Sequence, residues 1–109
     1  MQLYRLSLAV LLLVGCSPPE QNKQSSIMDE VERDVKLPPG AAPLSQYKRY
    51  YAYDTNGNVL AEYVRGSDQR DWVADHKSFP VISDGGCGVV NVRHNLRSGR
   101  SEAWCNGVS

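Results

Sequence analysis

The sequence predicts a mainly β protein, a small antiparallel sheet of about five strands with one disulfide. Three observations predict it. Short segments rich in Tyr and Val recur between turn-forming residues over 44–109. An Asn-Gly pair, Asn56 and Gly57, lies between two such segments and is typical of a tight hairpin. Two cysteines, Cys87 and Cys105, lie in the same region. Whether one short N-terminal helix also belongs to this fold is left open by the sequence.

Residues 1–15 are predicted to be a signal peptide, which takes no part in the fold. Arg5 precedes an apolar run over residues 6–14, and Gly15 supplies a small residue before the cleavage point. The run is shorter than the roughly 20 residues that a membrane-spanning helix needs.

The three residues directly before Cys16, Leu13, Val14 and Gly15, resemble the lipobox of bacterial lipoproteins. This resemblance implies a thioether-linked diacylglycerol on Cys16, cleavage before it, and often a further acyl chain. Two or more chains give stable membrane anchoring, at about 0.8 kcal/mol per buried methylene. Ser17, rather than an aspartate, follows the cysteine, which favours the outer membrane facing the periplasm. An ordinary signal peptide that contains a cysteine by chance is the alternative.

Residues 16–43 are expected to hold the lipidated cysteine and a flexible tether. Residues 17–26 are polar and lack a periodic apolar face, so they bury too little surface to offset the cost of ordering. Beyond them Ile27, Val31 and Val35 follow at four-residue spacing, and Ser26 could cap a short helix. Such a helix forms only if its apolar stripe docks, so both states stay open.

The β domain is expected over residues 44–109. Residues 47–53 and 59–64 have strong strand propensity and form the predicted hairpin. Further strand segments are expected at 70–73, 79–82, 87–94 and 100–105, and Pro80 would confine the second of these to an edge or a strand start.

Cys87 and Cys105 are predicted to form a disulfide, because an even number of cysteines in an exported chain favours pairing. Closing this loop stabilises the fold by about 3 kcal/mol in the chain-entropy model. A turn centred between Arg97 and Ser98 would not oppose the two cysteines directly. A bulge, a shifted turn or a bend near Gly85 and Gly86 would bring their Cα atoms within the required distance of about 7 Å.

The search for chemistry finds no catalytic motif, and no cofactor or metal is predicted. His76 and His94 are expected at the surface without a nucleophile beside them. Asp54 does not begin an EF-hand, because Gly57 would occupy the fourth position instead of the sixth. The formal net charge is 0, with 12 basic and 12 acidic residues. A nucleic-acid-binding protein would show a clustered excess of basic residues, so nucleic acid is not a predicted partner.

The predicted function is that of a non-enzymatic, membrane-anchored envelope lipoprotein whose domain binds another macromolecule, an envelope protein or a glycan. The candidate interaction surface consists of the hairpin tyrosines, since tyrosine is enriched in binding hot spots; its members are Tyr47, Tyr50, Tyr51, Tyr53 and Tyr63. The competing interpretation is that they fill and rim a small core. The alternative functions are an envelope-polymer hydrolase, which a His–acid pair in a cleft would favour, and a structural accessory subunit.

Overall fold

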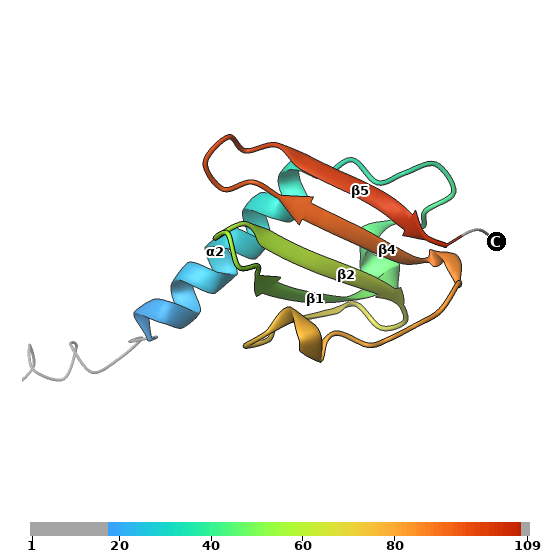
Figure 1. Cartoon of the computed structure of the whole chain (residues 1–109). Coiled ribbons are helices and arrows are strands. Elements are labelled where there is room, and N and C mark those ends of the chain that lie inside the picture. Colours follow the sequence, from blue (N-terminus) through green and yellow to red (C-terminus); the bar gives the residue numbers. More distant parts are fainter. Residues whose placement is uncertain (1–17, 108–109) are drawn as a thin grey trace, which may run out of the picture.

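The computed structural model describes residues 18–107, in which one helix lies against one face of a five-stranded sheet (Figure 1). The predicted signal peptide and the lipidation site, Cys16, lie outside the described residues. No helix within residues 18–107 is both long and apolar enough to cross a membrane. In chain order the elements are α2 (Pro19–Asp34), η1 (Leu44–Gln46), β1 (Tyr47–Tyr53), β2 (Val59–Arg65), β3 (Gln69–Trp72), η2 (His76–Ser78), β4 (Gly86–His94) and β5 (Ser101–Asn106).

The strand order is β3-β1-β2-β4-β5, and four of the five strands pair antiparallel, as predicted. The sheet is mixed, however, because β3 pairs parallel to β1, with Tyr51 beside Trp72. The reason is topological. β3 reverses direction after β2, and β4 occupies the free edge of β2, so β3 adds to the other side of β1 and runs parallel to it.

The predicted hairpin is confirmed as β1 and β2. Its turn is fixed by Asp54, whose Oδ1 accepts hydrogen bonds from the backbone N–H groups of Asn56 at 2.8 Å and Asn58 at 2.9 Å. Gly57 takes the positive φ, 82°, that the turn requires.

Residues 79–82 were predicted to form a strand and do not. The segment lies on the sheet face opposite α2, where the Phe79 and Tyr50 rings are 6.4 Å apart. Pro80 has no N–H to give to a ladder, which agrees with an irregular covering segment. The predicted segment at 70–73 is confirmed as the edge strand β3.

The flexible tether predicted for residues 16–43 is wrong for most of its length, because Pro19–Asp34 forms the helix α2. Pro19 stands in the first turn, where its missing N–H leaves no helix bond unmade. The apolar stripe predicted the docking correctly: Ile27 and Val31 are buried in the core together with Met28. The helix begins earlier than the capping pattern at Ser26 predicts, since docking of its second half stabilises the polar first half as well.

Three hairpin tyrosines form the centre of the core instead of an exposed surface. Tyr47, Tyr51 and Tyr63 are 0% exposed, because strand alternation turns them toward α2. Tyr50 and Tyr53 are partly buried, the latter with its ring 4.8 Å from that of Trp72. The interpretation of these residues as a binding surface is therefore corrected in favour of the core.

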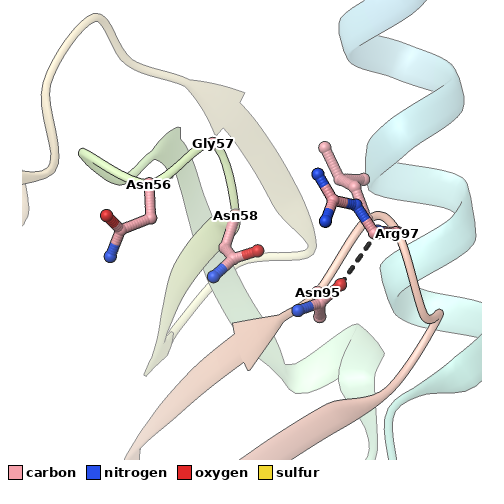
Figure 2. A pocket seen from close by; sticks show the side chains of 6 residues that line it. Asn56, Gly57, Asn58, Asn95 and Arg97 are labelled. Atoms are coloured by element: carbon pink, nitrogen blue, oxygen red, sulfur yellow. Dashed lines mark hydrogen bonds between the residues drawn. The ribbon is translucent and has the colours of Figure 1, made fainter.

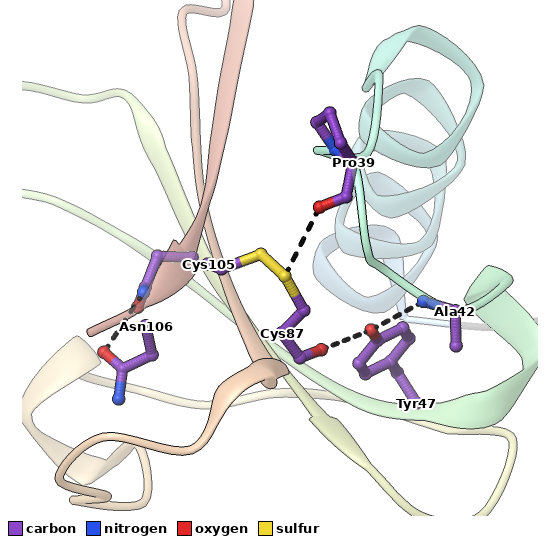
Figure 3. The surroundings of a disulfide bond; sticks show 7 residues. Pro39, Ala42, Tyr47, Cys87, Cys105 and Asn106 are labelled. Atoms are coloured by element: carbon purple, nitrogen blue, oxygen red, sulfur yellow. Dashed lines mark hydrogen bonds between the residues drawn. A yellow bond between two sulfur atoms is a disulfide. The ribbon is translucent and has the colours of Figure 1, made fainter. Parts of the chain in front are cut away.

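The predicted disulfide joins Cys87 to Cys105, with 4.6 Å between their Cα atoms (Figure 3). The ladder between β4 and β5 shifts register between Gly86 and Val90, so Cys105 pairs with Val90 and Cys87 lies in the bulge. The bulge resolves the misalignment expected from the sequence. Cys87 also lies against the chain that follows α2, where Gly40 has a φ of 91° and a Cβ there would come within 3.2 Å of the Cys87 sulfur.

Candidate functional site

The two tight turns of the sheet, residues 54–58 and 95–100, lie at the same end of the molecule. The register explains this, since Val59 after the first turn pairs with His94 before the second. A hollow of about 640 Å³ lies between them (Figure 2). It is lined by Asn56, Gly57, Asn58, Asn95, Leu96 and Arg97.

A second hollow, of about 420 Å³, adjoins the first and shares Asn58 and Asn95 with it. The rest of its lining comes from β4, β5 and the turn between them: Arg93, Ser98, Arg100, Ser101 and Glu102. The two hollows together are called the hairpin-end cleft below.

The β4–β5 turn holds the lining of the cleft in place through Asn95. Its Oδ1 accepts a hydrogen bond from the backbone N–H group of Arg97 at 2.9 Å (Figure 2). It also accepts one from the backbone N–H group of Ser98 at 2.9 Å. Gly99 closes the turn, with its N–H bonded to the Asn95 carbonyl oxygen at 2.8 Å and a φ of 76°. The backbone under Arg97 is therefore fixed, while its side chain is free to meet a ligand.

The hairpin-end cleft is positively charged. Three arginines line it, Arg93, Arg97 and Arg100, against one acid, Glu102. None of the three guanidinium groups forms an ion pair or a hydrogen bond with any residue in the range 18–107. A guanidinium group offers five donors in a planar fork that matches a carboxylate or a phosphate, so three unpaired ones suit an anionic ligand.

His94 lies buried directly beside the cleft, and the prediction of a surface histidine is wrong. It continues the inward alternation of Val90 and Val92 on β4 and is 0% exposed. Its Nε2 lies 2.6 Å from Glu30 Oε2 on α2, and its Nδ1 lies 2.5 Å from Ser101 Oγ on β5. A carboxylate only accepts, so Nε2 donates to Glu30, and in the neutral ring Nδ1 accepts the Ser101 hydroxyl proton.

The same cluster contains the donor atoms for a metal ion. Glu30, Asp34 and His94 each offer one atom, and the three lie within 4.8 Å of one another. All three donors already have partners in the protein, since His94 donates to Glu30 and pairs with Ser101, and Asp34 accepts from Arg33 at 3.0 Å. The cluster thus satisfies its own polar groups and joins α2 to the end of the sheet.

A second polar cluster joins α2 to β1 and β3. Glu32 Oε2 accepts from the Tyr51 hydroxyl at 2.6 Å and from Arg49 Nε at 3.2 Å, and lies 3.3 Å from Arg70 Nη1. Burial, followed by the nearby Tyr63 hydroxyl, raises the pKa of Tyr51 far above its ordinary value. Tyr51 therefore remains a donor at any physiological pH, and this cluster holds the helix in place without facing a cleft.

The residues predicted from sequence as site residues do not meet in the hairpin-end cleft. The disulfide lies beside the turn that follows α2, and the tyrosines lie in the core or against the segments that cover the sheet. The cleft arginines were missed because the formal charges of the whole chain balance. A local count finds them, since Arg93, Arg97 and Arg100 occur within eight residues that contain no acid.

No protein-family model matches the chain, and searches of curated proteins and of solved structures find no significant match.

Proposed function

We propose that the protein is a membrane-anchored envelope lipoprotein whose domain binds another macromolecule without catalysing a reaction. The anchor rests on the lipobox pattern before Cys16. The single observation that supports the binding role is the hairpin-end cleft, where three arginines without partners among residues 18–107 lie beside three asparagines. A macromolecule with negative charge meets both the charge and the hydrogen-bonding capacity of this cleft.

The cleft supports binding better than it supports catalysis. Its arginines and amides recognise a ligand, but they supply neither a nucleophile nor a general base. The buried histidine does not itself contact a ligand in the cleft, because it is 0% exposed and meets the cleft only through the hydroxyl of Ser101.

The test is a crosslinked pull-down of the lipidated protein from membranes, compared with two variants. Arg97→Glu combined with Arg100→Glu reverses the charge of the cleft, and we expect the dominant partner to be lost. Arg65→Glu is the matched control, since Arg65 is an exposed arginine on β2 that contacts Gln46 and lines neither hollow of the cleft. A partner retained by the double variant would overturn the assignment of the cleft.

The anchor is tested in the same experiment with Cys16→Ala. We expect this variant to leave the membrane fraction, because stable attachment needs the acyl chains. Unchanged membrane association would contradict the lipoprotein proposal and leave the cleft assignment to be judged from its own variants.

One observation favours a second candidate, an envelope-polymer hydrolase. Ser101, His94 and Glu30 form a continuous hydrogen-bonded chain of nucleophile, base and acid, and Ser101 lines the cleft. Hydrolysis of envelope polymers by the purified protein, abolished by Ser101→Ala with folding unchanged, would establish this candidate. Activity equal in both proteins, or absent in both, would remove it.

A further inference from the structure

A third hollow, of about 200 Å³, lies on the sheet face opposite α2. Trp104 of β5 forms one wall and is 44% exposed, while Phe79 and His76 of the covering segment form the other. Leu60, Asn91 and Arg93 lie between the walls on β2 and β4. Among the described residues, Trp104 is the one large hydrophobic aromatic side chain that is exposed, so a ligand can stack on its ring.

This hollow lies next to the hairpin-end cleft. Arg93 lines both the Trp104 hollow and the second hollow of the cleft. Asn58 and Asn95 in turn line both the second and the first hollow. The three hollows therefore lie in a row from Trp104 past Arg93 to the tip of the β1–β2 turn, and this row is called the path below. A path of this kind fits a linear chain better than a single compact ligand.

We propose that this path binds a linear anionic glycan, that is, a polysaccharide carrying carboxylate or phosphate groups. The inference rests on the proposed function and names its ligand. Arginines along the path bind the charged groups as bidentate partners. The asparagine amides both donate and accept, which suits the hydroxyl groups of sugars. The Trp104 ring offers an apolar face for one sugar ring.

The lining of the path favours a glycan over an acidic protein. Protein interfaces are built around buried apolar anchors on both partners, surrounded by a polar rim. Here polar side chains line the first two hollows, with Leu96 as the one large apolar group among them. The third hollow, at the far end, sets the exposed ring of Trp104 and the apolar Phe79 and Leu60 beside polar groups of Asn91 and Arg93. Successive polar subsites with one aromatic platform match the repeating chemistry of a sugar chain.

The experiment measures binding of oligosaccharides of increasing length to the full-length lipidated protein in detergent micelles, by titration calorimetry. Oligogalacturonates serve as the carboxylated probe and phosphomannan oligomers as the phosphorylated one, so the two arms identify the preferred anionic group. Neutral malto-oligosaccharides of equal length test the need for charge, and poly-glutamate tests for an acidic polypeptide.

We expect at least one anionic series to bind, with affinity that rises with length until the chain spans the path and that falls with added salt. Arg93→Gln should weaken every oligomer by about tenfold or more, because Arg93 stands where the hollows join. Trp104→Ala should weaken long oligomers by a similar factor and leave the shortest ones unchanged. Val81→Ala is the control, since Val81 is 95% exposed and lines none of the three hollows.

The outcomes separate the two proposals. Poly-glutamate binding as tightly as the anionic glycans, or glycan binding that ignores charge or length, would overturn the glycan proposal. No binding of either anionic series would also overturn it. The pull-down then decides about the proposed function. If the membrane partner is lost in the Arg97→Glu, Arg100→Glu variant, only the glycan proposal is contradicted. If the partner is retained, the cleft is not the binding site and both proposals are contradicted.

Discussion

Glu32 of α2 and Tyr51 of β1 are joined across the helix–sheet interface, where the tyrosine hydroxyl donates to the carboxylate at 2.6 Å. Tyr63 lies next in the same chain of hydrogen bonds, with its hydroxyl 3.0 Å from that of Tyr51. Because Tyr51 donates to Glu32, Tyr63 donates to Tyr51. The hydroxyl groups of the aromatic core therefore need a hydrogen-bond acceptor on the helix, and the carboxylate of Glu32 provides it.

Glu32→Ala is predicted to lower the free energy of unfolding by about 2 kcal/mol, because it leaves the Tyr51 hydroxyl without its acceptor and removes one of the two acids that pair with Arg49, which keeps Asp68. Chemical denaturation followed by circular dichroism measures this loss. Glu20→Ala is the matched control on the same helix, since Glu20 is exposed in the first turn, and it should change stability by less than about 0.5 kcal/mol. Equal effects of the two variants would contradict the role of Glu32.

Val31→Ala is predicted to destabilise the protein by about 2 kcal/mol. Val31 is 0% exposed and packs α2 onto the sheet, so truncation leaves a cavity at the interface. Thermal unfolding of Val81→Ala provides the comparison, because that valine is 95% exposed and its loss should leave the melting temperature almost unchanged. A wild-type melting temperature for Val31→Ala would mean that the helix does not contribute to the core.

Reduction of the disulfide, or Cys105→Ser, is predicted to lower the free energy of unfolding by about 3 kcal/mol. Denaturant titrations with and without reductant measure the difference. The contacts of Cys87 with residues 38–42 should loosen at the same time, because the bulge loses its tie to β5. Alkylation of Cys87 in the unreduced, exported protein would show that the bond is absent.

Glu62 on β2 gives the stability a dependence on pH. Its Oε2 is buried without a hydrogen-bond partner among the described residues, and burial raises the pKa of the carboxyl above its ordinary value of 4.5. The folded state thus holds this proton more tightly than the unfolded state does. The contribution of Glu62 is most favourable below pH 4.5 and declines as the pH rises through the raised pKa.

Glu62→Gln is therefore predicted to be more stable than the wild type at pH 7.5, by about 1 kcal/mol, and to match it at pH 3.5. Urea titrations at the two pH values test this. Glu102→Gln, on the exposed part of β5, should show no such difference. A Glu62→Gln variant that is less stable at both pH values would indicate a partner that this carboxylate needs.

The sequence predicted the parts of the fold that depend on local chemistry. Asn56 and Gly57 located the first hairpin, the two cysteines paired, and the stripe through Ile27 and Val31 docked. It did not predict the parallel pairing of β3, which depends on which sheet edge β4 leaves free. No local pattern carries that information.

The candidate site was less predictable from sequence than the fold was. Tyrosines suggested a surface because their propensities fit both a core and an interface, and only the position of α2 decides between the two. His94 looked like a surface residue, yet Glu30, 64 positions earlier, provides the buried partner. The cleft arginines become adjacent to Asn56 and Asn58 only when two separate hairpins meet at one end of the sheet.

The start of α2 at Pro19 limits how far the domain can stand from a bilayer. Three peptide units separate Cys16 from Pro19, and at 3.8 Å between successive Cα atoms they span at most about 11 Å. If Cys16 carries the acyl chains, the start of α2 lies close to the membrane, and the exposed first half of the helix is a rigid spacer between the membrane and the sheet. The anchored domain could then bind only those ligands that come within this fixed distance of the lipid headgroups.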